Sequence, residues 1–336
     1  MNFRLYHHPL IHQRCPSYLR RLSSASIQGL QGLVAEHSIY VSNSNNPYFN
    51  LTLEDWLFRN KNHDKPLLLL YRDVPCIVIG RNQNPWKEVN LQLAALRRVP
   101  FLRRRSGGGT VYHDIGNTNY SLHLPRSAYK IASKRAYHHG TMLISTKLDT
   151  LGDLLHATKE TMVTKGVASV RSPVQNLQRF NPAITHEGFV EASIQAFQEV
   201  YGVEEEPHYV EETENILNAP EIRKGMEELK SWDWQYGQTP EFTYSVSRLF
   251  DFGLAKAEIT SKHGVILSCK VDCPGVHSET LSRINQRMID MRYGFIKGFE
   301  EIDWDGEKEW KWSDDDGDRP LRTREIWNWI REEMSS

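Results

Sequence analysis

Three consecutive glycines flanked by arginines form the part of the sequence best suited to chemistry. Residues 103–119 read RRRSGGGTVYHDIGNTN, so an arginine run precedes the glycines, and His113 and Asp114 follow them. Glycines allow positive φ angles and close approach of the backbone, and their N–H groups can form a nest for an anion. Arginine adds bidentate contacts to phosphate oxygens. The combination favours a phosphate-binding site over a glycine-rich turn with a solvated basic flank.

Several other classes of protein are excluded. No GKS or GKT follows the glycines, as a P-loop requires, and the GxGxxG pattern of dinucleotide-binding loops is absent. A net charge of -1 and a pI near 6.9 provide no field for nucleic acid. Four cysteines are too few for a disulfide framework, and Cys269 and Cys273 have no second pair to complete a zinc site. No apolar run reaches the roughly 18 residues of a membrane span. We therefore expect no bound metal among the site residues, and no nucleic-acid or membrane partner.

The first 35 residues have the composition of a mitochondrial transit peptide. They are rich in arginine and serine, and no acidic residue precedes Glu36. A disordered basic tail would have a similar composition and is the alternative. We expect residues 1–35 to direct the chain to the mitochondrial matrix.

The rest of the chain predicts a mixture of helices and strands. Apolar residues at helical spacing predict a helix over Pro47–Arg59, and two short apolar runs predict buried strands at 67–71 and 76–79. Asn90 is expected to cap the next helix. Further elements are expected as strands at 101–105, 110–113, 119–124 and 140–145 and as a helix at 185–201. Because this order lacks a regular βαβ rhythm, we predict an α+β fold.

A domain boundary is predicted within Ser231–Pro240, which is rich in turn formers. Residues 40–238 are assigned to a catalytic domain and residues 240–336 to a small α+β accessory domain. The second is expected to contain a hairpin over Phe250–Asp272, a helix capped by Ser278 and extending to Phe295, and a short last helix around Ile326, Trp327 and Ile330. The acidic run SDDDGD at 313–318 lacks the spacing of a calcium loop and is expected to be solvated.

The glycine segment resembles the signature RRxSGGGxVxHDxGNxN of lipoate–protein ligases and the closely similar lipoyltransferases. Other stretches agree in order with the motifs of this family: Phe49-Asn50-Leu51 with Glu54, residues 78–88, Ser127-Ala128-Tyr129, residues 138–141, 165–172 and 231–238. The resemblance is strong over residues 45–240 and weak beyond. It implies a fungal-type mitochondrial member, with a mixed-sheet catalytic domain of the lipoate/biotin ligase type. A biotin ligase itself would carry a GRGRxG-type loop, which is absent.

The resemblance also implies a reaction and its site. Family members activate lipoate with ATP and Mg²⁺ to lipoyl-AMP and pass the lipoyl group to a lysine. The implied acceptors are the lipoyl domains of 2-oxoacid dehydrogenase E2 subunits and the glycine cleavage H protein. The positions implied around ATP or the adenylate are Arg104, Gly109, Thr110, Val111, Tyr112, Arg81, Asn84 and Lys87. Those implied along the lipoate chain are Tyr71, Ser106, His113 and His139.

One element of the family pattern is missing. The family carries a lysine four residues before its Ser-Ala-Tyr motif, where it holds the lipoyl carbonyl and the α-phosphate. Here the matching position is His123, in a predicted strand, and no lysine occurs between Thr110 and Tyr129. Several tens of residues that the family carries before this motif are absent as well. The catalytic residue is therefore unassigned, and Arg126, Lys130 and Lys134 are poor substitutes by position.

Two alternatives to a complete ligase follow from this absence. The chain could be a lipoyltransferase that accepts preformed lipoyl-AMP or an octanoyl donor, although such an enzyme would need the same lysine. It could also be a catalytically impaired adaptor that binds acceptor domains. The intact Arg104 and glycine loop argue against the adaptor.

Overall fold

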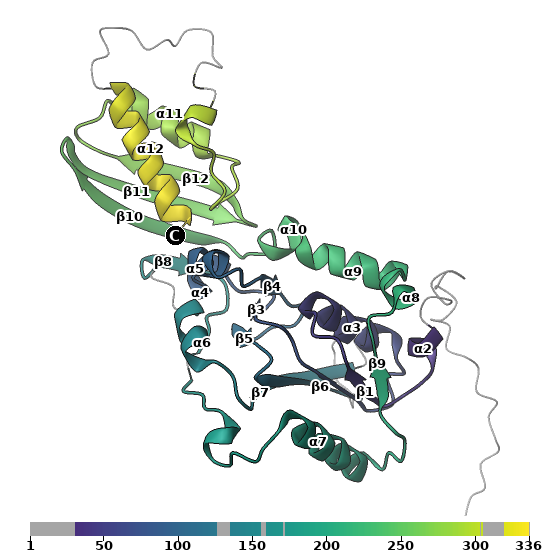
Figure 1. The fold of residues 1–336 in the computed structure, drawn as a ribbon. Coiled ribbons are helices and arrows are strands. Elements are labelled where there is room, and N and C mark those ends of the chain that lie inside the picture. Colours follow the sequence, from purple (N-terminus) through teal and green to yellow (C-terminus); the bar gives the residue numbers. More distant parts are fainter. Residues whose placement is uncertain are drawn as a thin grey trace, which may run out of the picture.

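The protein has the α+β fold that the sequence predicts (Figure 1). The computed structural model describes residues 31–125, 135–155, 159–170, 172–302, 304 and 319–335. The Ser127-Ala128-Tyr129 motif, Arg126, Lys130, Lys134, the acidic run 313–318 and nearly all of the predicted transit peptide lie outside these residues. In the described part of the chain, none of the helices combines the length and hydrophobicity needed to cross a membrane.

A five-stranded mixed sheet forms the base of the larger, N-terminal unit of the protein. Its strands, in spatial order, are β7 (Arg135–Leu143), β6 (Asn117–Pro125), β2 (Leu67–Tyr71), β1 (Ile39–Ser42) and β9 (His208–Val210). Strand β1 runs parallel to both of its neighbours, β2 and β9. Strand β6 runs antiparallel to both of its neighbours, β2 and β7. Helices α3 (Pro47–Asn60) and α7 (His186–Tyr201) lie on opposite sides of this sheet (Figure 1).

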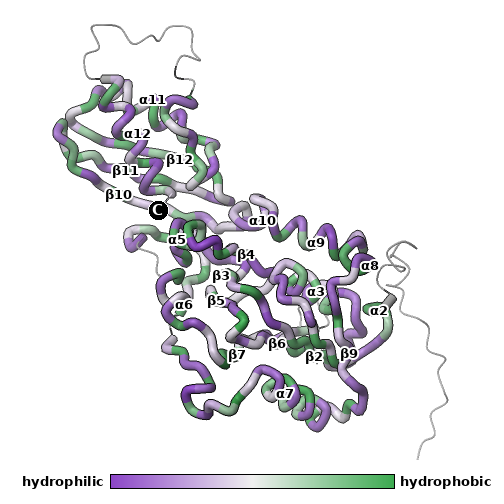
Figure 2. Tube along the Cα trace, in the orientation of Figure 1, coloured by the Kyte–Doolittle hydropathy of each residue, from purple (hydrophilic) through white to green (hydrophobic). Residues whose placement is uncertain are grey.

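Strand β2 is apolar at every position because both of its faces are covered. Side chains of a strand alternate between faces. Leu67, Leu69 and Tyr71 pack with residues of α3, and Leu68 and Leu70 pack with Phe197 of α7 and with β1. Both faces are thus covered, which gives a continuous hydrophobic run rather than an alternating one. Figure 2 shows this hydrophobic interior, with the mostly hydrophilic α9 (Pro220–Lys230) on the outside.

A three-stranded sheet carries the glycine loop. Its order is β4 (Phe101–Arg103), β3 (Cys76–Ile79) and β5 (Val111–His113). Because β4 and β5 flank β3, the loop between them crosses the end of the central strand. Nearby helices are α4 (Pro85–Glu88), α5 (Leu91–Leu96) and α6 (Leu148–Leu154). The predicted cap of α5 is confirmed, since Asn90 Oδ1 accepts from the Leu93 N–H at 3.0 Å.

A four-stranded antiparallel sheet dominates the C-terminal part. It comprises β12 (Val265–Asp272), β11 (Gly253–Lys262), β10 (Phe242–Phe250) and β8 (Met162–Thr164), so one strand comes from well before the predicted domain boundary. Helices α11 (Ser278–Met288) and α12 (Arg319–Ser335) cover one face (Figure 1). Their Ile284, Trp327 and Ile330 join the core of this unit. The remaining short helices are α2 (Gln31–Val34), α8 (Glu214–Leu217), α10 (Trp232–Gln235) and the 3-10 turns at Leu177–Arg179 and Phe299–Glu301.

Three elements differ most from the prediction. Helix α12 has 17 residues rather than a few. Helix α11 has His277 as its N-cap, so Ser278 is its first residue, and it ends at Met288 because Ile289 is extended and Asp290 adopts a positive φ. The strand expected at 140–145 begins at Arg135 and ends at Leu143.

Candidate active site

A cavity of about 900 Å³ opens between the two sheets of the larger unit. Strands β2, β3, β5 and β7 contribute to its wall, and the glycine loop, α6 and residues 159–174 complete the lining. Leu51, Tyr71, Val78 and Leu143 make part of this wall apolar. The cavity thus joins an apolar compartment to a polar loop.

Most of the predicted site residues line this cavity. They are Tyr71, Lys87, Arg104, Gly109, Thr110, Val111, Tyr112, His113 and His139. Arg81, Asn84 and Ser106 are not part of the lining, although Ser106 contacts two residues that are. The structure therefore gathers these residues in one place, and their roles as ligands of particular groups stay predictions.

Two of the predicted nucleotide contacts have other surroundings. Asn84 is buried, and its Oδ1 caps α4 by accepting from the Trp86 N–H at 3.0 Å. Its amide donates to the Met162 sulfur at 3.3 Å. The Arg81 guanidinium lies 5.3 Å from the ring centre of Trp234, and Arg81 is not among the residues that line the cavity. Asn84 thus fixes local structure here, and the nucleotide contact of Arg81 stays a prediction.

The arginines on either side of Arg104 are engaged elsewhere. Arg103 is fully buried and donates from Nε to the Gln235 carbonyl at 2.9 Å, which ties β4 to α10. Burial lowers the pKa of Arg103 to about 9. Arg105 pairs with Asp55 at 3.1 Å and with Glu228 at 2.6 Å. Of the three, only Arg104 faces the cavity.

Arg104 organises the glycine loop. Its Nη2 donates to the carbonyl oxygens of Gly107 and Gly109 at 2.6 and 2.7 Å, and its Nε donates to Ser106 Oγ at 3.1 Å. Nη1 donates to the Val78 carbonyl of β3 at 3.1 Å, so the loop is anchored to the central strand. Burial lowers the pKa of Arg104. The loop carbonyls turn toward this cation.

The backbone N–H groups of the three glycines differ from the loop carbonyls in their hydrogen bonding. Among the described residues, no hydrogen bond has a backbone N–H of Gly107, Gly108 or Gly109 as its donor. These glycines line the cavity, and Gly108 has a φ of +91°. N–H groups directed away from the protein's own acceptors can bind an anion.

A second set of contacts holds the far end of the loop. The Thr110 N–H donates to Ser169 Oγ at 3.0 Å, and Gln83 Nε2 donates to the same oxygen at 2.9 Å. Gln83 Oε1 accepts from the Thr110 hydroxyl at 3.0 Å. The segment around Ser169 is therefore joined to the loop, although the two are far apart in the sequence.

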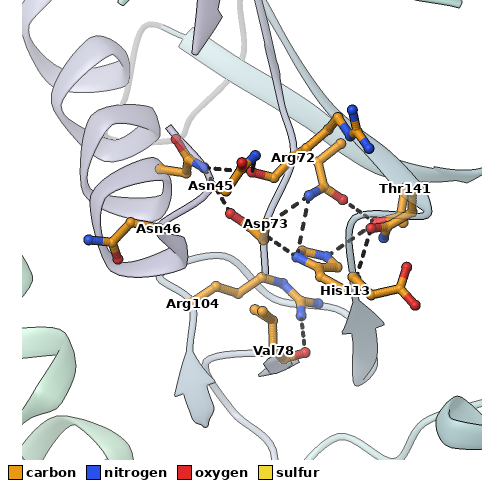
Figure 3. A network of polar contacts seen from close by, with 12 residues as sticks. Asn45, Asn46, Arg72, Asp73, Val78, Arg104, His113 and Thr141 are labelled. Carbon is orange, nitrogen blue, oxygen red and sulfur yellow. Dashed lines mark hydrogen bonds and ion pairs between the residues drawn. The ribbon is translucent and has the colours of Figure 1, made fainter. Parts of the chain in front are cut away.

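A buried polar network lies beside the cavity (Figure 3). His113 Nδ1 is 2.8 Å from Asp73 Oδ2, and Asn50 Nδ2 donates to Asp73 Oδ1 at 2.8 Å. His113 Nε2 is 3.3 Å from Thr141 Oγ1 on β7. Cys76 places a third possible ligand atom within 4.8 Å of those of Asp73 and His113. Since Asp73 and His113 already pair with each other, the network positions the cavity wall.

A second network ends at the glycine loop. His139 Nδ1 lies 3.3 Å from Glu54 Oε1, and His139 Nε2 lies 3.0 Å from Ser106 Oγ. Glu54 is buried within α3, whereas His139 is partly exposed on β7. Burial by itself would raise the pKa of Glu54, but hydrogen bonds from His139 and Ser121, together with the neighbouring imidazoles of His139 and His123, outweigh burial and lower that pKa. Glu54 therefore stays ionised beside the imidazole.

Within the described residues, two lysines line the cavity. Lys87 Nζ donates to the Met162 carbonyl, and Lys159 Nζ donates to the Glu333 carbonyl of α12. Burial lowers the pKa of Lys159 to about 8. His123, at the position that the family pattern gives to lysine, is buried in β6 opposite Tyr137 of β7. The prediction that it lies within a strand is confirmed.

Four residues at the site were given no role from the sequence, although Glu54, Gln83 and Ser169 lie within stretches that match the family motifs. Glu54, Asp73, Gln83 and Ser169 all contact predicted site residues. One sequence feature could have identified Glu54: it is an acid inside the apolar face of α3, next to Leu53 and near Trp56. The partners of the other three come from distant parts of the chain and leave no local pattern.

Comparisons with known proteins agree on one kind of relative. A family model of the lipoyl protein ligase A/B catalytic domain matches residues 46–130 and 127–198. The chain is 31% identical to the lipoate-protein ligase A of Psychrobacter cryohalolentis, with 74% of this chain and 86% of that protein aligned. It is 31% identical to that of Bdellovibrio bacteriovorus, with 76% and 88% aligned. The crystal structure of Plasmodium falciparum LipL1 in complex with lipoate has a TM-score of 0.52 and 25% identity, and covers 87% of this chain and 98% of its own.

The same comparisons support the predicted gap. The Psychrobacter alignment runs over 292 positions but takes in only 74% of the 336 residues, so several tens of positions have no residue of this chain. The two matches of the family model meet at residues 127–130. This is where the sequence predicts that a family segment is absent.

Proposed function

Because the chain belongs to the lipoate–protein ligase A family, whose members are ligases, we propose that it activates lipoate with ATP to lipoyl-AMP and transfers the lipoyl group to a protein lysine. The observation that carries this proposal is the cavity itself. Its apolar wall suits the carbon chain of lipoate. The glycine loop suits a phosphate, because no acceptor among the described residues takes a hydrogen bond from its three N–H groups.

The cavity lining offers both kinds of group that this reaction needs. Arg104 holds the loop carbonyls inward, so the loop N–H groups remain for the α-phosphate of the adenylate. Tyr71, His113 and His139 lie on strands and line the cavity, and we assign them to the wall beside the acyl chain. Electrostatic stabilisation by such preorganised donors is commonly the largest contribution to catalysis.

Mg²⁺ fits one part of the lining better than another. It prefers oxygen ligands with several waters, so the buried Asp73, Cys76 and His113 cluster suits it poorly. Glu88 and Glu160 line the cavity and would hold the ion. When bound with ATP, Mg²⁺ supplies charge neutralisation at the phosphates.

The activating half-reaction is expected to be slow in this chain. The family's lysine has no counterpart among residues 110–129, and the segment that would carry it is absent. Loss of one such charge-stabilising donor typically costs about 10²–10³ in rate. Water admitted to an open pocket would weaken the remaining charge contacts further. This observation favours a second candidate, a lipoyltransferase that works from preformed lipoyl-AMP.

Two assays on the same preparation test the proposal. We expect lipoate-dependent exchange of labelled pyrophosphate into ATP to be weak, and transfer from synthetic lipoyl-AMP to a lipoyl domain to be measurable. A version of the chain with the family segment restored after Leu124 should give strong exchange. Strong exchange by the 336-residue chain would contradict our account of the gap and point to Arg126, Lys130 or Lys134. If neither version gave exchange or transfer, the ligase proposal would fail.

The proposed partners are lipoyl domains of 2-oxoacid dehydrogenase E2 subunits and the glycine cleavage H protein, because each presents the acceptor lysine that this chemistry requires. The proposed location is the mitochondrial matrix, on the strength of the acid-free residues 1–35.

A further inference from the structure

The contacts of Ser106 join a hydroxyl, an imidazole and a carboxylate in series. Ser106 Oγ is 3.0 Å from His139 Nε2, and Glu54 Oε1 is 3.3 Å from the other ring nitrogen, Nδ1. These residues come from the glycine loop, β7 and α3, so three separate elements hold the arrangement. It is the order of groups that activates a serine nucleophile.

The carboxylate determines which nitrogen carries the proton. Glu54 is buried in α3 and accepts from His139 Nδ1, which fixes the tautomer with a proton on Nδ1. The lone pair of Nε2 then faces Ser106 Oγ and can take its proton. A solvated histidine without this partner would sample both tautomers.

Two further features favour a nucleophilic serine over a structural one. Arg104 Nε donates to Ser106 Oγ at 3.1 Å, which places a positive charge where alkoxide character would develop. The next residues, Gly107 and Gly108, line the cavity with N–H groups that no hydrogen bond of the described residues uses. Such N–H groups can receive the negative charge of a carbonyl oxygen under attack.

We propose that Ser106, His139 and Glu54 form an acyl-transfer triad, in which Ser106 Oγ accepts a lipoyl or octanoyl group from an activated ester or thioester. The inference rests on the proposed function only in that the cavity must hold the acyl chain. Ser106 is not part of the cavity lining, but its hydroxyl contacts Arg104 and His139, which both line the cavity.

The reaction would proceed in two balanced steps. In the first, Ser106 Oγ bonds to the acyl carbonyl carbon and its proton passes to His139 Nε2. The bond to the leaving thiol or alcohol breaks, and His139 returns the proton to that group. In the second, the amine of an acceptor lysine attacks the acyl-serine, His139 takes the amine proton, and Ser106 Oγ leaves and recovers it. The product is the same amide that a ligase forms, made without ATP and without the lysine that this chain lacks.

Covalent labelling of the full chain tests the proposal directly. With p-nitrophenyl octanoate as the probe, we expect a stoichiometric burst of p-nitrophenolate and an octanoyl adduct on the peptide that contains Ser106, identified by mass spectrometry. Ser106→Ala should lose the adduct. His139→Gln should slow the burst by about 10²–10⁴, the usual contribution of a general base. Ser245→Ala, at an exposed serine on β10, is the matched control and should label as the parent does.

Further variants separate catalysis from folding. Ser106→Cys should be acylated as a thioester, even if Ser106→Ala perturbs the loop. Glu54→Gln should slow acylation while the affinity for octanoate stays the same, because Glu54 acts through His139. An adduct on a lysine, or no adduct on the parent chain, would overturn the triad. If Ser106→Ala kept full transfer from synthetic lipoyl-AMP while the parent showed no adduct, the proposed function would stand and the triad would fall.

Discussion

Replacement of Arg104 tests whether the glycine loop is the phosphate-binding part of the cavity. Arg104 is buried and makes five hydrogen bonds, three of them to loop carbonyls, one to Ser106 Oγ and one to the Val78 carbonyl in β3. The Arg104→Ala variant removes all five and leaves the loop without its central cation. The Arg104→Lys variant keeps the charge but has no planar fork to reach these acceptors together.

The magnitudes follow from where the acceptors lie. Water can replace the lost partner of the exposed Gly107 and of the half-buried Gly109, but it reaches the carbonyl of the buried Val78 in β3 less easily. An acceptor left unpaired costs about 1–3 kcal/mol, and we expect the free energy of unfolding to fall by that amount. Loss of a charge-assisted contact, worth about 1.5–3 kcal/mol, should weaken binding of a lipoyl-AMP analogue by about 10–100-fold.

The assays are isothermal calorimetry with a nonhydrolysable lipoyl-AMP analogue and urea unfolding of each variant. Arg104→Lys should recover part of the stability and little of the affinity. Arg97→Ala, an exposed arginine paired with Asp153 on the surface, is the matched control and should change neither by much. Unchanged affinity in Arg104→Ala would show that the adenylate is bound elsewhere in the cavity.

Three further predictions concern pH, packing and targeting. Burial lowers the pKa of Lys159 from 10.5 to about 8, so between these pH values the unfolded chain binds a proton that the folded chain has released. The free energy of unfolding should therefore rise with pH over this range. Lys159→Met should flatten that rise in urea titrations. A Cβ at Gly80 would lie 2.1 Å from the Gly108 carbonyl oxygen, so Gly80→Ala should displace the loop and lower the melting temperature. Gly152→Ala is the control, because a Cβ there would have nothing within 4 Å, and it should not lower the melting temperature. Equal melting temperatures of the two variants would show that the loop can move aside without loss of stability. Residues 1–35 fused to a fluorescent protein should enter mitochondria and be removed, and a cytosolic fusion with its N-terminus intact would contradict the targeting proposal.

The elements that form the site were largely predictable from the sequence. Local patterns identify α3, β2, β3 and the cap at Asn90, because helix and strand periodicity and capping depend on neighbours in the chain. The glycine loop was identified from composition alone, since few other residue types allow such a backbone. The absence of the family's lysine was also visible in the sequence, as was the abrupt approach of β6 to the Ser127 motif.

The boundaries of the C-terminal elements were less predictable. Apolar spacing continues past Met288, yet the backbone leaves the helix there, and α12 extends well beyond its apolar core positions. The participation of β8 in the last sheet depends on pairing between Met162–Thr164 and Phe242–Tyr244. Such pairing joins segments far apart in the chain, which no local window can reveal.

The sequence by itself determined that an arginine-flanked glycine loop lies between two strands, and what kind of ligand such a loop binds. Only the tertiary structure decided which arginine faces the cavity. Arg103 donates to the Gln235 carbonyl and Arg105 donates to Glu228, and both partners lie more than a hundred positions later in the chain. The same holds for Glu54, His139 and Ser106, which meet because α3, β7 and the loop pack around one cavity. Residue types set the chemistry that is available, but contacts between distant segments select which of it is assembled, since they form only when the sheets and helices bury their shared core.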